Sequence, residues 1–132
     1  MVIQQLAYKK ILVPYDTSNP ADNAIEHATN LAGPDSEVIL LHVITEIPLY
    51  PVMEHAIKSR KEERRTLEGH VQHVYSALQN DAVKMLDEKK RQYAKGLRGI
   101  KTEVVLGRPV SKIVEYAQSK GVDLIVMGST GY

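Results

Sequence analysis

Four short apolar segments divide the chain in the manner of strands that alternate with helices. Each segment is continuously apolar or nearly so, which indicates strands that are covered on both faces. Longer stretches of helical periodicity separate them, so the pattern predicts an α/β domain on an open parallel sheet with helices on both faces. The four segments are Ile11–Val13, Val38–Ile44, Val104–Leu106 and Leu124–Met127.

The polar residues around these segments predict the order of two strands. The third segment extends back to Lys101 and includes Glu103, and such charges suit the edge of a sheet. The second segment is almost wholly apolar, so we expect it near the centre and the third at the periphery.

Two helices can be placed by their end signals. In the first, Ser18 or Asn19 serves as the N-cap, and Gly33 with the following proline ends the helix. The second opens at Pro109 and stops at Gly121. Both have apolar positions at helical spacing, which predicts one buried face each. These positions are Ala21, Ala24, Ile25, Ala28, Leu31 and Ala32 in the first helix, and Val110, Ile113, Val114 and Ala117 in the second.

The region from Glu46 to Lys95 contains an apolar stripe that predicts a further helix. One helix over about forty residues would be roughly 60 Å long, which exceeds a compact domain of this size. We therefore expect a break, with the charged stretch Lys58–Arg65 in a loop or a separate short helix. The stripe consists of Leu67, Val71, Val74, Tyr75, Leu78, Ala82, Met85 and Leu86.

Composition excludes several classes of function. The chain of 132 residues has the length of one domain. Its 17 basic and 16 acidic residues give a net charge of +1, so neither nucleic acid nor an anionic membrane is the expected partner. The chain contains no cysteine, which excludes disulfides and thiolate chemistry. Residues Met1–Lys10 have neither the apolar run nor the cleavage site of a signal peptide, and no apolar run has transmembrane length, so we expect a cytoplasmic protein.

The turn after the first strand is the first candidate site. Pro14-Tyr-Asp-Thr-Ser18 joins a strand to a capped helix, whose N-terminus offers free N–H groups to an anion. The Asp16 carboxylate is able to accept hydrogen bonds from ribose hydroxyls or an adenine amine. The alternative is that Asp16 and Thr17 only turn the chain and cap the helix.

The end of the fourth strand is the second candidate. Gly128-Ser-Thr-Gly131 follows that strand, and two glycines three apart let a phosphate approach the backbone closely, with Ser129 and Thr130 as extra donors. By itself this pattern also fits a plain loop. It lacks the Gly-Lys-Ser/Thr of a Walker A motif and is not the dinucleotide fingerprint.

Taken together, four motifs resemble the universal stress protein family in order and spacing. They are Lys10-Ile-Leu-Val-Pro-Tyr-Asp16, Leu41-His-Val43, Gly107-Arg-Pro109 and Asp123-Leu-Ile-Val-Met-Gly-Ser-Thr-Gly131. The resemblance runs from Lys9 to Gly131. It implies a parallel sheet of strand order 3-2-1-4-5 with the adenine-nucleotide alpha-hydrolase-like fold, a homodimer, and membership of a family that divides into ATP binders and non-binders.

The resemblance also implies roles for particular residues. In the ATP-binding branch, the positions of Pro14, Tyr15 and Asp16 line the adenosine pocket, and that of Val43 packs against adenine. Met127, Gly128 and Gly131 match the start of the phosphate-binding motif. The second half of that motif is absent, as are the family's final helix and strand. We therefore expect one domain, 1–132, that lacks these last elements and leaves an exposed apolar edge at the fourth strand.

Other candidate residues favour structural explanations. His70 and His73 lie three apart on the expected helix with no apparent third metal ligand, so a surface pair is expected. His42 within a buried strand is expected to be a hydrogen-bonded core residue. No catalytic residue is assigned, because no side chain is placed as a general base.

Three functions remain open from the sequence. The first is an adenine-nucleotide switch in a stress response, which binds ATP or AMP, with Mg²⁺ only if a triphosphate binds. The second is a dimeric interaction module of the same family that binds no nucleotide. The third, an enzyme, extends at most to slow ATP hydrolysis.

Overall fold

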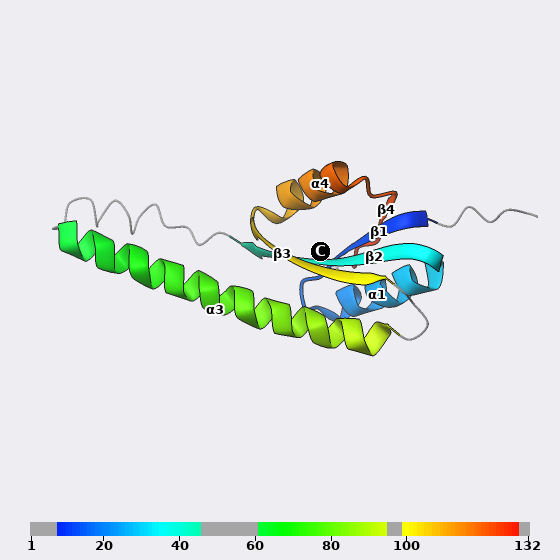
Figure 1. Ribbon diagram of the computed structural model, residues 1–132, viewed down its shortest axis with the longest axis horizontal. Helices are drawn as coiled ribbons and strands as arrows, with labels where there is room; N and C mark the ends of the chain where they lie inside the picture. The colour runs from blue at the N-terminus through cyan, green and yellow to red at the C-terminus, as the bar shows by residue number, and fades with distance from the viewer. Residues whose placement is uncertain (1–7, 46–60, 95–98, 130–132) are drawn as a thin grey trace, which may run out of the picture.

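A computed structural model of the chain describes residues 8–45, 61–94 and 99–129. The described elements alternate between strands and helices, as the apolar pattern predicts (Figure 1). In chain order they are β1 (Tyr8–Pro14), α1 (Asn19–Leu31), β2 (Ala32–Thr45), α3 (Lys61–Tyr93), β3 (Ile100–Gly107), α4 (Pro109–Lys120) and β4 (Leu124–Ile125).

The four strands form one parallel sheet in the order β3-β2-β1-β4. This confirms the predicted fold class, and it places β2 inside the sheet and β3 at an edge. Each inner strand is buried on both faces because successive side chains point to opposite sides. In β1, Ile11 and Val13 pack toward α1 and α3, whereas Leu12 packs toward α4. In β2, Val38 and Leu40 face the first side, and Ile39 the second.

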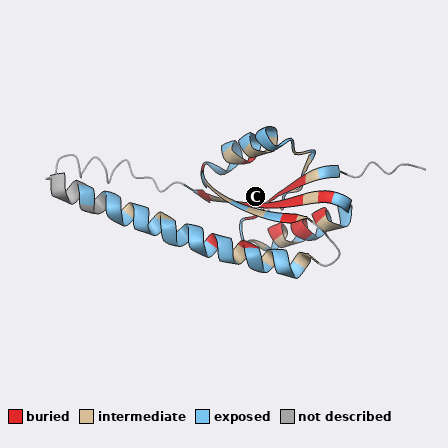
Figure 2. Ribbon diagram, viewed as in Figure 1, coloured by how far each residue is buried: buried red, intermediate tan, exposed pale blue. Residues whose placement is uncertain are grey.

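Helices therefore cover both faces of the sheet, and the buried residues gather where helix and strand meet (Figure 2). On one side, Ala24 and Ile25 of α1 and Leu86 of α3 are at most 3% exposed. On the other side, Ile113 is the buried residue of α4. Val110 and Val114 are 75% and 47% exposed, so the predicted apolar face of α4 is buried only in part.

The predicted helix ends agree with the structure with one shift. Ser18 is the N-cap of α1, and its side chain accepts a hydrogen bond from the Ala21 N–H. Gly121 ends α4 in the left-handed conformation that glycine adopts readily. The first helix ends at Leu31, before the predicted Gly33-Pro34 stop, because Ala32 is already extended and begins β2.

The predicted break within the third helical region was wrong. α3 is one helix of 33 residues, about 50 Å long at 1.5 Å per residue, and Lys61–Arg65 belong to it; Lys58–Arg60 lie outside the described residues. Compactness is not a constraint here because the helix extends past the sheet (Figure 1). Its sequence contains no proline, and strong helix formers support it over this length.

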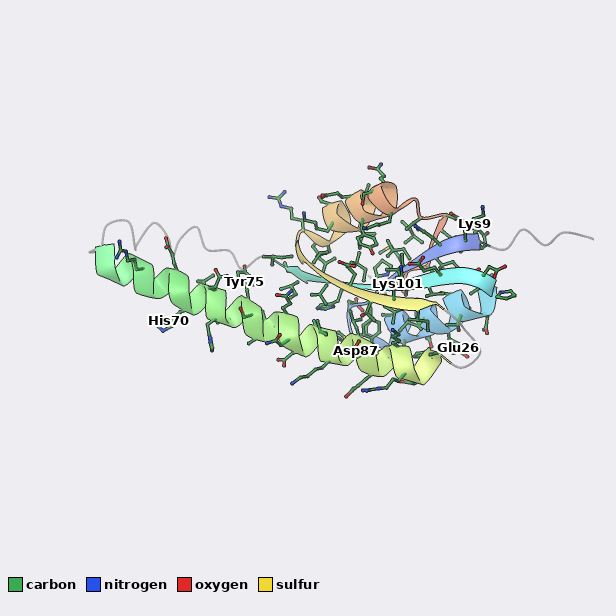
Figure 3. The ribbon with its side chains drawn as sticks, in the orientation of Figure 1. Lys9, Glu26, His70, Tyr75, Asp87 and Lys101 are labelled. Atoms are coloured by element: carbon green, nitrogen blue, oxygen red, sulfur yellow. The ribbon has the colours of Figure 1, made fainter. Side chains whose placement is uncertain are left out.

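The two halves of α3 have different surroundings. The C-terminal half packs on the sheet through Ala82 and Leu86, which are 5% and 0% exposed. In the half that extends past the sheet, Val74 is 45% exposed. Leu78, near the middle of the helix, is 42% exposed and lies at the carboxyl ends of the strands. Figure 3 shows His70 on this extending part and Asp87 on the packed part. Among the stripe residues whose burial the structure describes, only Ala82 and Leu86 are fully buried, and both lie where the helix packs on the sheet.

Apolar residues in and after β4 are partly exposed. β4 pairs with β1 through Leu124 and Ile125. Ile125 is 39% exposed, and Met127, which follows the strand, is 58% exposed.

Candidate functional site

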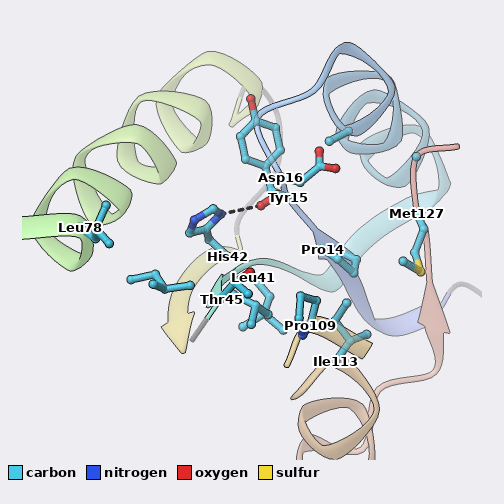
Figure 4. A pocket seen from close by; sticks show the side chains of 14 residues that line it. Pro14, Tyr15, Asp16, Leu41, His42, Thr45, Leu78, Pro109, Ile113 and Met127 are labelled. Atoms are coloured by element: carbon cyan, nitrogen blue, oxygen red, sulfur yellow. Dashed lines mark hydrogen bonds between the residues drawn. The ribbon is translucent and has the colours of Figure 1, made fainter. Parts of the chain in front are cut away.

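A cavity of about 510 Å³ opens beyond the carboxyl ends of β1, β2 and β4 (Figure 4). This is where the sheet order reverses, since β2 and β3 lie on one side of β1 and β4 on the other. Ligands of open α/β sheets bind at such points. The lining is predominantly apolar with a few polar groups, which is typical of small-molecule sites. It comprises Pro14, Tyr15, Asp16, Ala21, Leu41, His42, Val43, Ile44, Thr45, Leu78, Pro109, Ile113, Met127 and Gly128.

The turn that leaves β1 is held by the side chain of Asp16. Its Oδ1 accepts a hydrogen bond from the Ser18 N–H at 3.1 Å and another from the Ser18 hydroxyl. Ser18 Oγ in turn accepts from the Ala21 N–H at 3.2 Å, at the start of α1. Between them Thr17 has φ = 70°, a conformation that a β-branched residue rarely adopts. The turn is therefore kept in a strained shape by the helix cap.

Asp16 holds the turn and also lines the cavity. Its Oδ1 accepts the two hydrogen bonds from Ser18 that hold the turn, and the residue also lies on the wall of the cavity. The hydrogen bond from the Ser18 hydroxyl is the main cause that lowers the pKa of Asp16, and it outweighs the effect of partial burial. Asp16 is thus an anionic acceptor at neutral pH.

Tyr15 is fixed through its backbone between β1 and β2. Its N–H donates to the carbonyl of Leu41 at 2.8 Å. Its carbonyl oxygen lies 2.8 Å from Nδ1 of His42 (Figure 4). Because a carbonyl only accepts, Nδ1 of His42 carries the proton in this contact. His42 is hydrogen-bonded, as predicted, but it is only half-buried and lines the cavity instead of lying in the core.

Gly128 brings the end of β4 onto the start of α1. A Cβ at this position would lie 2.4 Å from the carbonyl carbon of Pro20 and 2.7 Å from the nitrogen of Ala21. Glycine is therefore required here by backbone packing. The same contact places Gly128 beside the N-terminus of α1, whose dipole is positive at that end.

Comparisons with known proteins identify the family. A sequence profile of the universal stress protein family matches residues 7–132. Universal stress protein MJ0531 of Methanocaldococcus jannaschii is 32% identical over 125 residues, which is 94% of this chain and 66% of that protein. MJ0577 of the same organism is 34% identical over 129 residues, 94% of this chain and 78% of that protein. The chain belongs to the universal stress protein family.

Solved structures of the family share its fold. The structure of MJ0577 matches with a TM-score of 0.73 at 29% identity, covering 96% of this chain and 81% of that one. The universal stress protein UspA from Lactobacillus plantarum matches with a TM-score of 0.58 at 25% identity, covering 96% and 83%. The chain therefore spans between 66% and 83% of the length of these relatives.

The fold gathers most of the residues predicted for the site. Six of them line the cavity: Pro14, Tyr15, Asp16, Val43, Met127 and Gly128. Thr17 and Ser129 adjoin lining residues but are not part of the lining. Gly131 lies outside the described residues.

Several residues that line the cavity of this universal stress protein were not among the predicted site residues. Pro109 and Ile113 come from the start of α4, and the Gly107-Arg-Pro109 motif was a signal that the β3–α4 turn reaches the site. Leu78 comes from α3. Its position depends on how the long helix crosses the sheet, for which the sequence has no local signal.

Neither a metal cluster nor a membrane helix is found in the described parts of the chain. No group of three or more His, Cys, Asp or Glu side chains is arranged to hold a metal among the described residues. His70 and His73 are both exposed on α3. None of the described helices combines the length and hydrophobicity needed to cross a membrane.

Proposed function

We propose that this universal stress protein binds an adenine nucleotide, ATP or AMP, and acts as a switch in a stress response. One observation carries the proposal: the Pro14–Asp16 turn, the end of β2 and Met127–Gly128 line a single cavity. The homodimer and the cytoplasmic location implied by the family resemblance are part of the same proposal.

The chemistry of the cavity fits each part of an adenine nucleotide. Val43, Ile113 and Met127 offer apolar surface to a flat base. The Asp16 carboxylate suits ribose hydroxyls, which donate hydrogen bonds. Gly128 and the N-terminus of α1 lie side by side and suit a phosphate. Among the lining residues Asp16 is the only carboxylate, so a Mg²⁺ ion would be held chiefly by the phosphates of a triphosphate.

Two relatives support the ligand class. Structures similar to this chain include a universal stress protein in complex with cAMP and a family protein from Arabidopsis thaliana with AMP bound. Both share the fold of this chain, with TM-scores of 0.52 and 0.54 at 19% identity, and their ligands support the proposal as an analogy.

Isothermal titration with ATP and AMP tests the proposal. We expect binding to the wild type and a loss of most of the affinity in Asp16→Ala. Asp35→Ala is the matched control, because it removes an exposed carboxylate near the start of β2, at the opposite end of the sheet. Equal affinities of the wild type and Asp16→Ala would remove Asp16 from the site. No heat with either nucleotide would overturn the function.

The alternative function is a dimeric interaction module that binds no nucleotide. The exposure of Ile125 and Met127 along the edge strand β4 favours it. Sedimentation of a folded protein that binds no nucleotide would then show a stable dimer.

A further inference from the structure

A network of three side chains lies behind the wall of the cavity. The Tyr15 hydroxyl donates to Oδ1 of Asp22 at 2.8 Å. Nζ of Lys89 lies 2.9 Å from the same oxygen and 5.8 Å from the centre of the Tyr15 ring. Figure 4 shows the Tyr15 hydroxyl directed away from the other labelled cavity residues. We call these residues the Tyr15 clamp: Tyr15 in the β1–α1 turn, Asp22 in α1 and Lys89 in α3.

The clamp joins the cavity to two helices. Tyr15 lines the cavity and is 4% exposed, whereas Asp22 and Lys89 are not lining residues. Tyr15 also immediately precedes Asp16, and Thr17 beyond it is strained. The shape of the turn therefore depends on how firmly Tyr15 is held, and Asp22 and Lys89 hold its hydroxyl end.

We infer that Asp22 and Lys89 are positioning residues of the nucleotide site: they order Tyr15, and through it the Asp16 turn, before a ligand arrives. The inference rests on the proposed function and extends it to α3. A site whose walls are ordered in advance does not lose side-chain freedom on binding, and this strengthens affinity. The contacts of Asp22 and Lys89 give the positioning of Tyr15 to two side chains that are 67 residues apart in sequence.

Adenosine is the probe that separates positioning from charge. Adenosine carries no phosphate and no net charge, so the loss of the Lys89 charge does not change a net electrostatic attraction to it. We expect Tyr15→Phe, Asp22→Ala and Lys89→Met each to weaken adenosine binding by about 2- to 12-fold, the range that corresponds to ordering one side chain. The Tyr15→Phe/Asp22→Ala double variant should be little weaker than either single variant, because both break the same contact.

The direction in which Asp22→Ala changes the affinity for ATP separates positioning from charge. If these residues acted only through charge, removal of a carboxylate would strengthen the binding of an anion, whereas positioning predicts weaker binding. Lys89→Arg should retain affinity close to the wild type, because arginine also pairs with a carboxylate. Lys101→Met is the matched control: it breaks the 3.1 Å ion pair with Glu37, which joins β2 and β3 away from the cavity, and should leave affinity unchanged.

The outcomes separate the two claims. Wild-type binding of adenosine with unchanged affinity in all three single variants would overturn the clamp and leave the proposed function intact. Tighter ATP binding by Asp22→Ala would overturn it as well. A wild-type protein that is folded by circular dichroism and binds neither adenosine nor ATP would overturn both.

Discussion

Replacing Gly128 by alanine is expected to destabilise the protein even when no nucleotide is present. The added Cβ would lie 2.4 Å and 2.6 Å from the carbonyl carbon and oxygen of Pro20, and 2.7 Å from the nitrogen of Ala21. Non-bonded carbon atoms are comfortable at about 3.5–4.0 Å, so the overlap is about 1 Å. All three neighbours are backbone atoms, so no rotamer change relieves it.

The magnitude follows from what has to move. Ala21 is 2% exposed and its N–H donates to the Ser18 side chain, so the start of α1 has little room to move away from a new Cβ. Overpacking of this kind costs about 1–3 kcal/mol. For a domain of this length that corresponds to a fall in melting temperature of roughly 3–15 °C.

Thermal unfolding of the nucleotide-free protein, followed by circular dichroism, is the assay. Gly69→Ala is the matched control because it makes the same chemical change within α3, where the new Cβ meets nothing within 4 Å. There alanine favours the helix by up to about 1 kcal/mol, so the melting temperature should stay the same or rise. A melting temperature of Gly128→Ala equal to that of the wild type would refute the packing argument. If the melting temperature falls as expected, a loss of nucleotide binding in Gly128→Ala cannot be taken as proof of a phosphate contact, because the packing of the variant is itself disturbed.

Three further predictions concern the β1–α1 turn. Thr17→Asn should raise the free energy of unfolding, measured in urea, by about 0.5–1 kcal/mol, because asparagine tolerates the positive φ of 70° better than threonine does. A loss of stability would show that a contact of the Thr17 side chain outweighs the relief of backbone strain. The pKa of Asp16 is lowered in the folded state, so its contribution to stability is complete above its ordinary value of 3.8 and is lost as the pH falls through the folded pKa. The stability difference between wild type and Asp16→Asn should therefore stay constant from neutral pH down to about pH 5 and shrink only in stronger acid, and melting temperatures that converge already near neutrality would contradict this. Burial first, and the Asp22 carboxylate second, raise the pKa of Tyr15, so the contribution of Tyr15 to stability is present below the ordinary value of 10.0 and is lost as the pH rises through the folded pKa. Ultraviolet titration should therefore show that Tyr15→Phe removes a tyrosine that titrates at higher pH than the others. Removal of a tyrosine that titrates at lower pH would contradict the clamp.

The sheet and the position of the candidate site could be predicted because their signals are local. Val38–Leu41 is apolar at every position, and in a parallel sheet this means burial on both faces. The residues that follow β1 and β4 meet at one edge because the two strands are parallel neighbours, so Asp16 and Gly128 line the same cavity.

The remaining features depend on contacts between distant parts of the chain. The continuous α3 could not be predicted from the size of a compact domain, because the helix extends past the sheet (Figure 1). Tyr15, Asp22 and Lys89 are unremarkable in sequence, and only the path of α3 across the sheet brings Lys89 to Asp22. The glycine at 128 suggested close approach of a phosphate, and the structure adds that Pro20 already occupies the space of a side chain.

A titration of ¹⁵N-labelled protein with AMP, followed by NMR, tests the central claim most directly. We expect the amide signals of Asp16, Val43 and Gly128 to shift together with one saturation curve, while those of Lys101 and Asp35 stay in place. Shifts that cluster on the extending half of α3, or that leave Asp16 and Gly128 unmoved at saturation, would contradict a nucleotide site at the carboxyl ends of these strands.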